Sequence, residues 1–218
     1  MRKFQLPTEA KALFTLRTWY MVGILGFALP FTFQVFRFLT PLSLLLLLLL
    51  FFLYHDKRDR KFWMVMIIIF LAGYGIEVAG VKTGRIFGVY EYGKVLGIKL
   101  LGVPLIIGVN WVIMVYGAVA ISSLTKWGRL FGSFLAALIM TASDFFIEKF
   151  AILSGMWSWH SSDPPMQNYL AWLIFSFAFC LLAYPSIAGK TRKVGIHGYL
   201  YQLLFFILII TIHQLFWP

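Results

Sequence analysis

The chain has 218 residues, of which 61% are hydrophobic, 19% aromatic and only 12% charged, and its mean hydropathy is +0.86. Soluble globular chains are about 45–50% apolar and about 25% charged, so this excess of apolar side chains excludes an ordinary soluble domain. The formal net charge is +11. Because no nucleic-acid module accompanies that charge, we expect the basic residues to contact membrane lipid and expect no nucleic-acid partner.

Apolar runs along the chain predict a polytopic, all-α bundle of about seven transmembrane helices in a single domain. A helix needs about 20 predominantly apolar residues to cross a bilayer. The expected spans cover about residues 15–34, 38–54, 62–81, 100–121, 130–151, 166–187 and 196–216. The single cysteine, Cys180, lies in an apolar run, so the sequence excludes an intrachain disulfide and a cysteine metal cluster.

The basic residues predict a multi-pass protein of the cell membrane with its N-terminus in the cytoplasm and its C-terminus outside. Cytoplasmic loops are enriched in Lys and Arg, and this orientation places most of the basic residues inside. These are Arg2, Lys3, Lys11, Arg17, Lys57, Arg58, Arg60, Lys61, Lys126, Arg129, Lys190, Arg192 and Lys193. The loop between the third and fourth spans breaks the rule with Lys82, Arg85, Lys94 and Lys99. His55 lies in a charged cytoplasmic loop, where we expect it to be solvated.

Three acidic residues lie inside two of the predicted spans. Glu77 lies in the third span, and Asp144 and Glu148 lie in the fifth. Ionisable groups at membrane depth are costly and usually mark functional sites. Asp144 and Glu148 are one helical turn apart, so they share a helix face. The alternative is that the acids pair with basic residues such as Arg85 or Lys149 and only stabilise the bundle.

The two acid-bearing spans are followed by similar segments. GVYEY (88–92) begins eleven residues after Glu77, and GMWSW (155–159) begins eleven residues after Asp144. This recurrence predicts a parallel internal repeat, whose approximate two-fold axis along the membrane normal would bring Glu77 and Asp144 together near the outer side. The alternative is chance, because aromatic residues are enriched at membrane interfaces.

Carboxyl groups in an apolar cavity ringed by aromatic side chains suit one kind of chemistry. A carboxylic acid that its site keeps protonated is a proton donor, and aromatic rings stabilise a nearby cation. This combination predicts protonation of an alkene, after which water or a second double bond captures the carbocation. Such a reaction needs no cofactor. No paired E-x-x-H spacing is present either, so we expect no metal site.

Several longer motifs resemble one family over about residues 70–190. They are TGRIFGVYEY (83–92), LGIKLLGVPL (96–105), Asn110-Trp111, SDFFIE (143–148), GMWSW (155–159) and the segment 168–172. Together they resemble the membrane carotenoid-biosynthesis proteins, a family that includes the carotenoid hydratases. The resemblance implies a hydro-lyase that adds water to the terminal double bond of an acyclic ψ end group of a carotenoid and leaves a tertiary alcohol. One departure is Lys149, which stands where a proline is expected after Glu148.

These observations give each candidate residue a hypothetical role. Asp144 is the candidate general acid, Glu77 is the partner that orients or deprotonates water, and Glu148 is a third catalytic candidate of less certain role. The candidates for binding the substrate, its cation and the water are Tyr90, Tyr92, Trp157, Trp159, Asn110, Trp111, Asn168, Trp172 and His160. The alternative for the aromatic residues of the two paired motifs is an anchor at the membrane interface.

Other classes of protein share some of these features. A carotenoid cyclase uses the same protonation but captures the cation with an internal alkene. A small transporter would also carry acids at membrane depth, and a structural membrane subunit is a further alternative. The final span has no lysine for a Schiff base, which excludes a retinal protein. The residues leave open which carotenoid reacts, whether one or both ends react, which acid donates the proton, and the oligomeric state.

Overall fold

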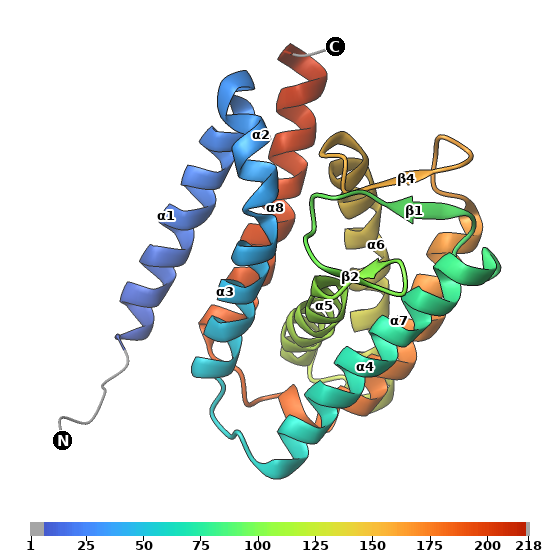
Figure 1. Ribbon diagram of the computed structural model, residues 1–218. Helices are drawn as coiled ribbons and strands as arrows, with labels where there is room; N and C mark the ends of the chain where they lie inside the picture. Colours follow the sequence, from blue (N-terminus) through green and yellow to red (C-terminus); the bar gives the residue numbers. More distant parts are fainter. Residues whose placement is uncertain (1–6, 217–218) are drawn as a thin grey trace.

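The computed structural model describes residues 7–216, so Arg2 and Lys3, two of the predicted cytoplasmic residues, lie outside the described part. The fold is an all-α bundle with a few short strands (Figure 1). The helices are α1 (Glu9–Ala28), α2 (Pro30–Phe38), α3 (Thr40–Leu53), α4 (Arg60–Thr83), α5 (Ile106–Ser122) with the 3-10 turn η1 (Ser123–Thr125), α6 (Gly128–Leu153), α7 (Met166–Ile187) and α8 (Lys193–Phe216).

Five helices within residues 7–216 are long and apolar enough to cross a membrane. They are α4, α5 with η1, α6, α7 and α8. The pair α2 and α3 adds a sixth span if it counts as one, although the two helices are bent by 55°. The chain therefore forms a multi-pass membrane protein, with five or six spans assigned by length and composition.

The N-terminal helices differ from the expected first span, 15–34. Helix α1 ends at Ala28, and α2 begins at Pro30. Proline lacks a backbone N–H donor, so it interrupts a helix but fits well in the first turn of the next. Pro41 lies in the first turn of α3 in the same way. The two prolines thus divide the apolar run into three helices.

Helix α5 begins at Ile106, whereas the sequence predicted a span from about residue 100. A hairpin takes the intervening place, in which β2 (Lys99–Leu100) pairs antiparallel with β3 (Val103–Pro104). The Tyr74 hydroxyl of α4 donates hydrogen bonds to backbone carbonyl oxygens in both strands, at 2.5 and 3.0 Å. The hairpin is therefore fixed to α4, and the chain enters α5 only after it.

Helix α5 lies at the centre of the bundle. It contacts α3, α4, α6, α7 and α8, and nearly all of its residues are buried. A helix that is apolar on every side is buried by its neighbours, and α5 carries no charged residue between Ile106 and Ser122. The acid-bearing helices α4 and α6 therefore pack on a common apolar core.

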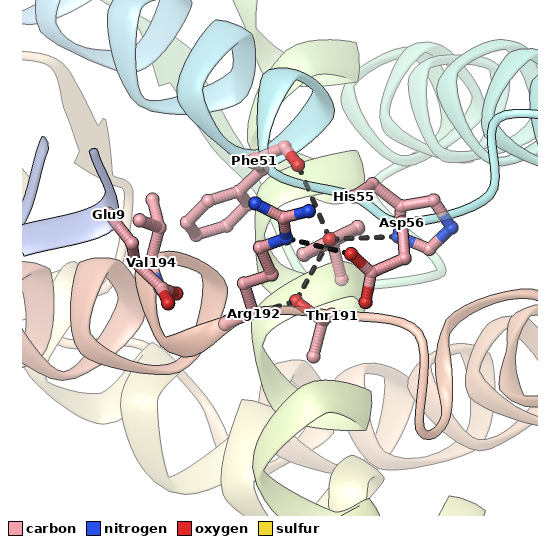
Figure 2. A network of polar contacts seen from close by, with 8 residues as sticks. Glu9, Phe51, His55, Asp56, Thr191, Arg192 and Val194 are labelled. Carbon is pink, nitrogen blue, oxygen red and sulfur yellow. Dashed lines mark hydrogen bonds and ion pairs between the residues drawn. The ribbon is translucent and has the colours of Figure 1, made fainter. Parts of the chain in front are cut away.

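A polar network joins two loops at the end of the bundle where α1 starts (Figure 2). We call it the loop network; its members are His55, Asp56, Tyr116, Thr191 and Arg192. The Tyr116 hydroxyl lies 3.0 Å from His55 Nδ1 and 2.9 Å from Thr191 Oγ1, and Arg192 Nε donates to Asp56 at 2.7 Å. The prediction of a solvated His55 is wrong, because its loop folds back against α5 and buries the imidazole beside Tyr116.

Candidate active site

Two short strands lie over the acid-bearing helices at the opposite end of the bundle (Figure 1). Strand β1 (Tyr90–Tyr92) follows α4, and β4 (Trp157–Trp159) follows α6. The strands pair antiparallel, with Tyr90 opposite Trp159 and Tyr92 opposite Trp157. Successive side chains of a strand point to opposite faces, so both tyrosines are buried while Glu91 between them is exposed. The two aromatic motifs thus meet in one small sheet.

Both acid-bearing helices end next to a glycine in the left-handed conformation. Gly84 follows α4 with a φ of 63°, and Gly155 follows the last residues of α6 with a φ of 66°. Glycine adopts this conformation without steric cost and commonly terminates helices. The chain turns back at these points, which lets β1 and β4 lie against the helices that precede them.

Glu77 of α4 is buried and accepts hydrogen bonds on both carboxyl oxygens. The hydroxyls of Tyr90 and Tyr92 donate to Oε2 at 2.5 and 2.8 Å, and Trp111 Nε1 of α5 donates to Oε1 at 3.1 Å. Burial and the neighbouring Glu77 raise the pKa of both tyrosines well above the usual range. The tyrosines therefore keep their protons and remain donors to the carboxylate.

Trp111 reaches Glu77 because α4 has a glycine at the contact. A Cβ atom added to Gly73 would lie 2.5 Å from the Trp111 ring, which is closer than atoms can approach. The indole also stacks on Trp172 of α7, with ring centroids 4.3 Å apart and planes at 9°. Gly73 thus fixes the spacing between α4 and α5 that this hydrogen bond requires.

Glu148 and Asp144 of α6 share a single amide donor. The indole N–H groups of Trp157 and Trp159 donate to Glu148 Oε2 at 2.8 and 2.7 Å. Asn168 Nδ2 of α7 lies 2.9 Å from Asp144 Oδ2 and 3.4 Å from Glu148 Oε1. The amide therefore bridges the two carboxyl groups and holds them on the same side of α6.

Asp144 differs from the other two acids in the hydrogen bonding of one carboxyl oxygen. Its Oδ1 is buried and has no hydrogen-bond partner in the described part of the chain. The ion pairs found among residues 7–216 are Lys57–Asp59 and Arg192–Asp56, so the three acids have no basic partner there. Lys149 instead places its ammonium group over the Phe145 ring. The alternative in which Arg85 or Lys149 neutralises the acids by a direct ion pair therefore does not hold.

The three acids surround one small cavity, which we call the acid cavity. The centre of a water-sized sphere can occupy about 20 Å³ of it, which is room for about one water molecule. Its lining consists of Glu77, Phe87, Tyr90, Tyr92, Ile107, Asn110, Asp144, Ile147, Glu148, Trp157, Trp159, Asn168 and Trp172. The site therefore combines carboxyl groups, amides and aromatic rings around space for a single small molecule.

Most of the residues singled out in the sequence line the acid cavity, but two do not. Trp111 lies behind Glu77, to which it donates. His160 is exposed just beyond β4, and its backbone N–H bonds to Val89. The apolar lining residues Phe87, Ile107 and Ile147 could not be recognised from the sequence. Apolar side chains are too common in this chain for any of them to stand out.

The fold and the site define a multi-pass membrane protein with a cluster of buried carboxyl groups between its helices. The chain belongs to a family described as "carotenoid biosynthesis protein", whose model matches residues 20–217. It is also 30% identical over 132 residues to the bisanhydrobacterioruberin hydratase of Haloarcula japonica. That match covers 57% of this chain and 45% of the relative, so the chain spans less than half of the relative's length. No solved structure matches the chain.

Proposed function

We propose that this protein is a carotenoid hydratase of the hydro-lyase type, which adds water to the terminal double bond of an acyclic ψ end group without a cofactor. The observation that carries the proposal is the free Oδ1 atom of Asp144 beside a cavity with room for about one water. The family membership and the hydratase relative support the same reaction. Among the described residues, Asp144 accepts a hydrogen bond from one side chain, whereas Glu77 and Glu148 each accept from three.

In the proposed reaction, protonated Asp144 gives its proton to the less substituted carbon of the terminal double bond. The π electron pair forms the new C–H bond and leaves a tertiary carbocation on the neighbouring carbon. A water molecule then forms the C–O bond and loses a proton to a carboxylate. That proton returns to Asp144, so the cycle consumes only the alkene and water.

Glu148 suits the role of proton acceptor better than Glu77. Asn168 bridges Glu148 to Asp144, and its 3.4 Å contact is the only hydrogen bond that Glu148 Oε1 accepts within residues 7–216. Both oxygens of Glu77 accept shorter hydrogen bonds, from Tyr90, Tyr92 and Trp111. In this arrangement Glu77 contributes negative charge near the carbocation. The aromatic rings that line the cavity stabilise the same cation by about 0.5–2 kcal/mol each.

We also infer seven membrane passes and an internal repeat. Counting α1 as one pass and the bent α2–α3 pair as another gives seven, and the start of α1 and the end of α8 lie at opposite ends of the bundle (Figure 1). The distribution of Lys and Arg favours a cytoplasmic start and an acid cavity near the outer side. The pairing of β1 with β4 supports the repeat, because it joins the two matching motifs.

Expression in a host that accumulates acyclic carotenoids, followed by mass spectrometry of the pigments, tests the proposed reaction. We expect a product heavier by one water, and a loss of at least about 100-fold in Asp144→Asn, because general acids contribute about 10²–10⁴ in rate. The matched control is Glu91→Gln, which removes an exposed acid from β1. An isomer of unchanged mass would indicate cyclisation, and a fully active Asp144→Asn protein would exclude Asp144 as the acid.

A further inference from the structure

A second, larger cavity lies between helices α1, α2–α3, α6 and α8. It offers about 280 Å³ to the centre of a water-sized sphere, and we call it the apolar groove. Trp19 and Val22 at its edge are 40% and 51% exposed, so the groove opens on the surface that faces lipid. Apolar and aromatic side chains make up most of its lining, among them Tyr20, Phe27, Leu44, Phe150, Phe205 and Phe206.

A narrow gap lies between the apolar groove and the acid cavity. Gln202 and Phe206 of α8 line both the groove and the gap. On its other side the gap is lined by Ile147, which also lines the acid cavity. The gap has no room for a water molecule as it stands. The shared residues therefore place the gap next to the groove on one side and next to the acid cavity on the other.

Gln202 places an unpaired polar atom at the junction of the groove and the gap. Its side chain is 4% exposed, and its Oε1 has no hydrogen-bond partner among the described residues. A buried acceptor left unsatisfied costs about 1–3 kcal/mol, so protein interiors rarely contain one. An unsatisfied amide at the junction of groove and gap is typical of a site that a ligand or water completes.

We propose that the apolar groove binds the polyene chain of the substrate, with the end group passing through the gap to the acids. This inference rests on the proposed function, since it assumes that the reacting end group lies in the acid cavity. That cavity is too small for more than a small part of a carotenoid. The remaining chain is long, flat and apolar. The groove offers aromatic faces, access from lipid and lining residues that it shares with the gap beside the acid cavity. The gap opens when the chain enters.

Binding can be measured separately from turnover in the Asp144→Asn background. The probe is an acyclic forty-carbon polyene with two ψ ends, quantified by its absorbance after it copurifies with the protein in detergent. Ser43 of α3 lines the groove, so Ser43→Phe fills it; we expect at least a tenfold loss of bound polyene. Ser43→Ala removes the hydroxyl without filling the groove, and Leu45→Phe adds a ring on the exposed side of α3. Both controls keep the pigment.

The size-exclusion profile shows whether each variant is folded. If Ser43→Phe aggregates, Thr40→Phe replaces it, because Thr40 also lines the groove. Equal pigment in a folded groove-filling variant overturns the proposal, and so does equal loss in Leu45→Phe. With Asp144 restored, a ten-carbon isoprenoid carrying the same end group should react as fast in Ser43→Phe as in the parent protein. If the parent protein hydrates neither substrate, the proposed function fails, while the binding result still decides what occupies the groove.

Discussion

The loop network and the acid cavity lie at opposite ends of the bundle, and both bury polar side chains. In the loop network the charges are of both signs, and Arg192 pairs with Asp56 at 2.7 Å. Its contacts join residues far apart in the sequence: Tyr116 contacts Thr191, 75 positions away. Such contacts hold loops together, so the network has the features of a structural element.

The acid cavity brings three carboxyl groups together without an ion pair to any described basic residue. Ionisable groups at membrane depth cost free energy, and a structure selected only for stability would avoid this arrangement. The two clusters therefore differ in one respect: the acidic residue of the loop network has a basic partner, and the acids of the cavity have none among the described residues. Substitutions in the acid cavity should therefore lower activity more than stability, and substitutions in the loop network should do the reverse.

The strongest test of this comparison in the acid cavity is Glu148→Gln. An amide cannot take the proton from water, so we expect turnover to fall by about 100-fold or more. The midpoint of unfolding in SDS mixed micelles should stay the same or rise, because a buried ionisable group is removed. Pigment mass spectrometry and the unfolding midpoint are measured on the same preparation. Glu91→Gln is the control, and retained turnover in Glu148→Gln would contradict the role of Glu148.

The contact between α4 and α5 gives the next largest effect. In Gly73→Ala the new methyl group meets the Trp111 ring and displaces it from Glu77. We expect about a tenfold loss of turnover and a loss of about 1–3 kcal/mol in unfolding free energy. Gly75→Ala is the matched control on the same helix, because nothing lies within 4 Å of its added Cβ atom. Equal effects of both substitutions would show that helix flexibility, not the position of Trp111, controls the site.

Sequence reasoning located the acids because a charged residue inside an apolar run stands out. It also identified the aromatic pairs, since Tyr90 and Trp157 lie at matching distances from Glu77 and Asp144. It did not foresee that the two motifs pair as strands, because two three-residue segments carry too little pattern to define a register. Nor did it show which acid keeps a free oxygen, since that depends on where Asn168 of a different helix points.

The fold could be predicted in its class but not in its details. Apolar runs of about 20 residues define helices, so α6 and α7 could be placed within two residues at either end. The hairpin before α5 was missed because Leu100 and Val103 are apolar and extend the run without any change in composition. The exposure of His55 could not be predicted either. Its charged sequence neighbours indicate a solvated loop, whereas its tertiary contact with Tyr116 helps to bury it.

In the loop network, Tyr116→Phe should change stability and leave activity nearly unchanged. The substitution removes the hydroxyl that lies within hydrogen-bond distance of His55, Thr191 and the Phe51 carbonyl oxygen. We expect a loss of about 1–2 kcal/mol in unfolding free energy, because buried polar groups lose a partner, and turnover within about twofold of the parent protein. A tenfold loss of turnover in the folded variant would contradict a purely structural role for the loop network.

The smallest expected effect is a dependence of stability on pH through His55. Burial lowers the pKa of this imidazole from its usual 6.5, Lys190 acts in the same direction, and Asp56 opposes them. Between the lowered folded value and 6.5 the unfolded chain binds more protons than the folded one. The contribution of His55 to stability is therefore present above about pH 6.5 and is lost as the pH falls through this window. Unfolding midpoints between pH 7.5 and 5 measure it. His55→Gln should flatten the slope, and identical slopes in both proteins would mean that another group titrates.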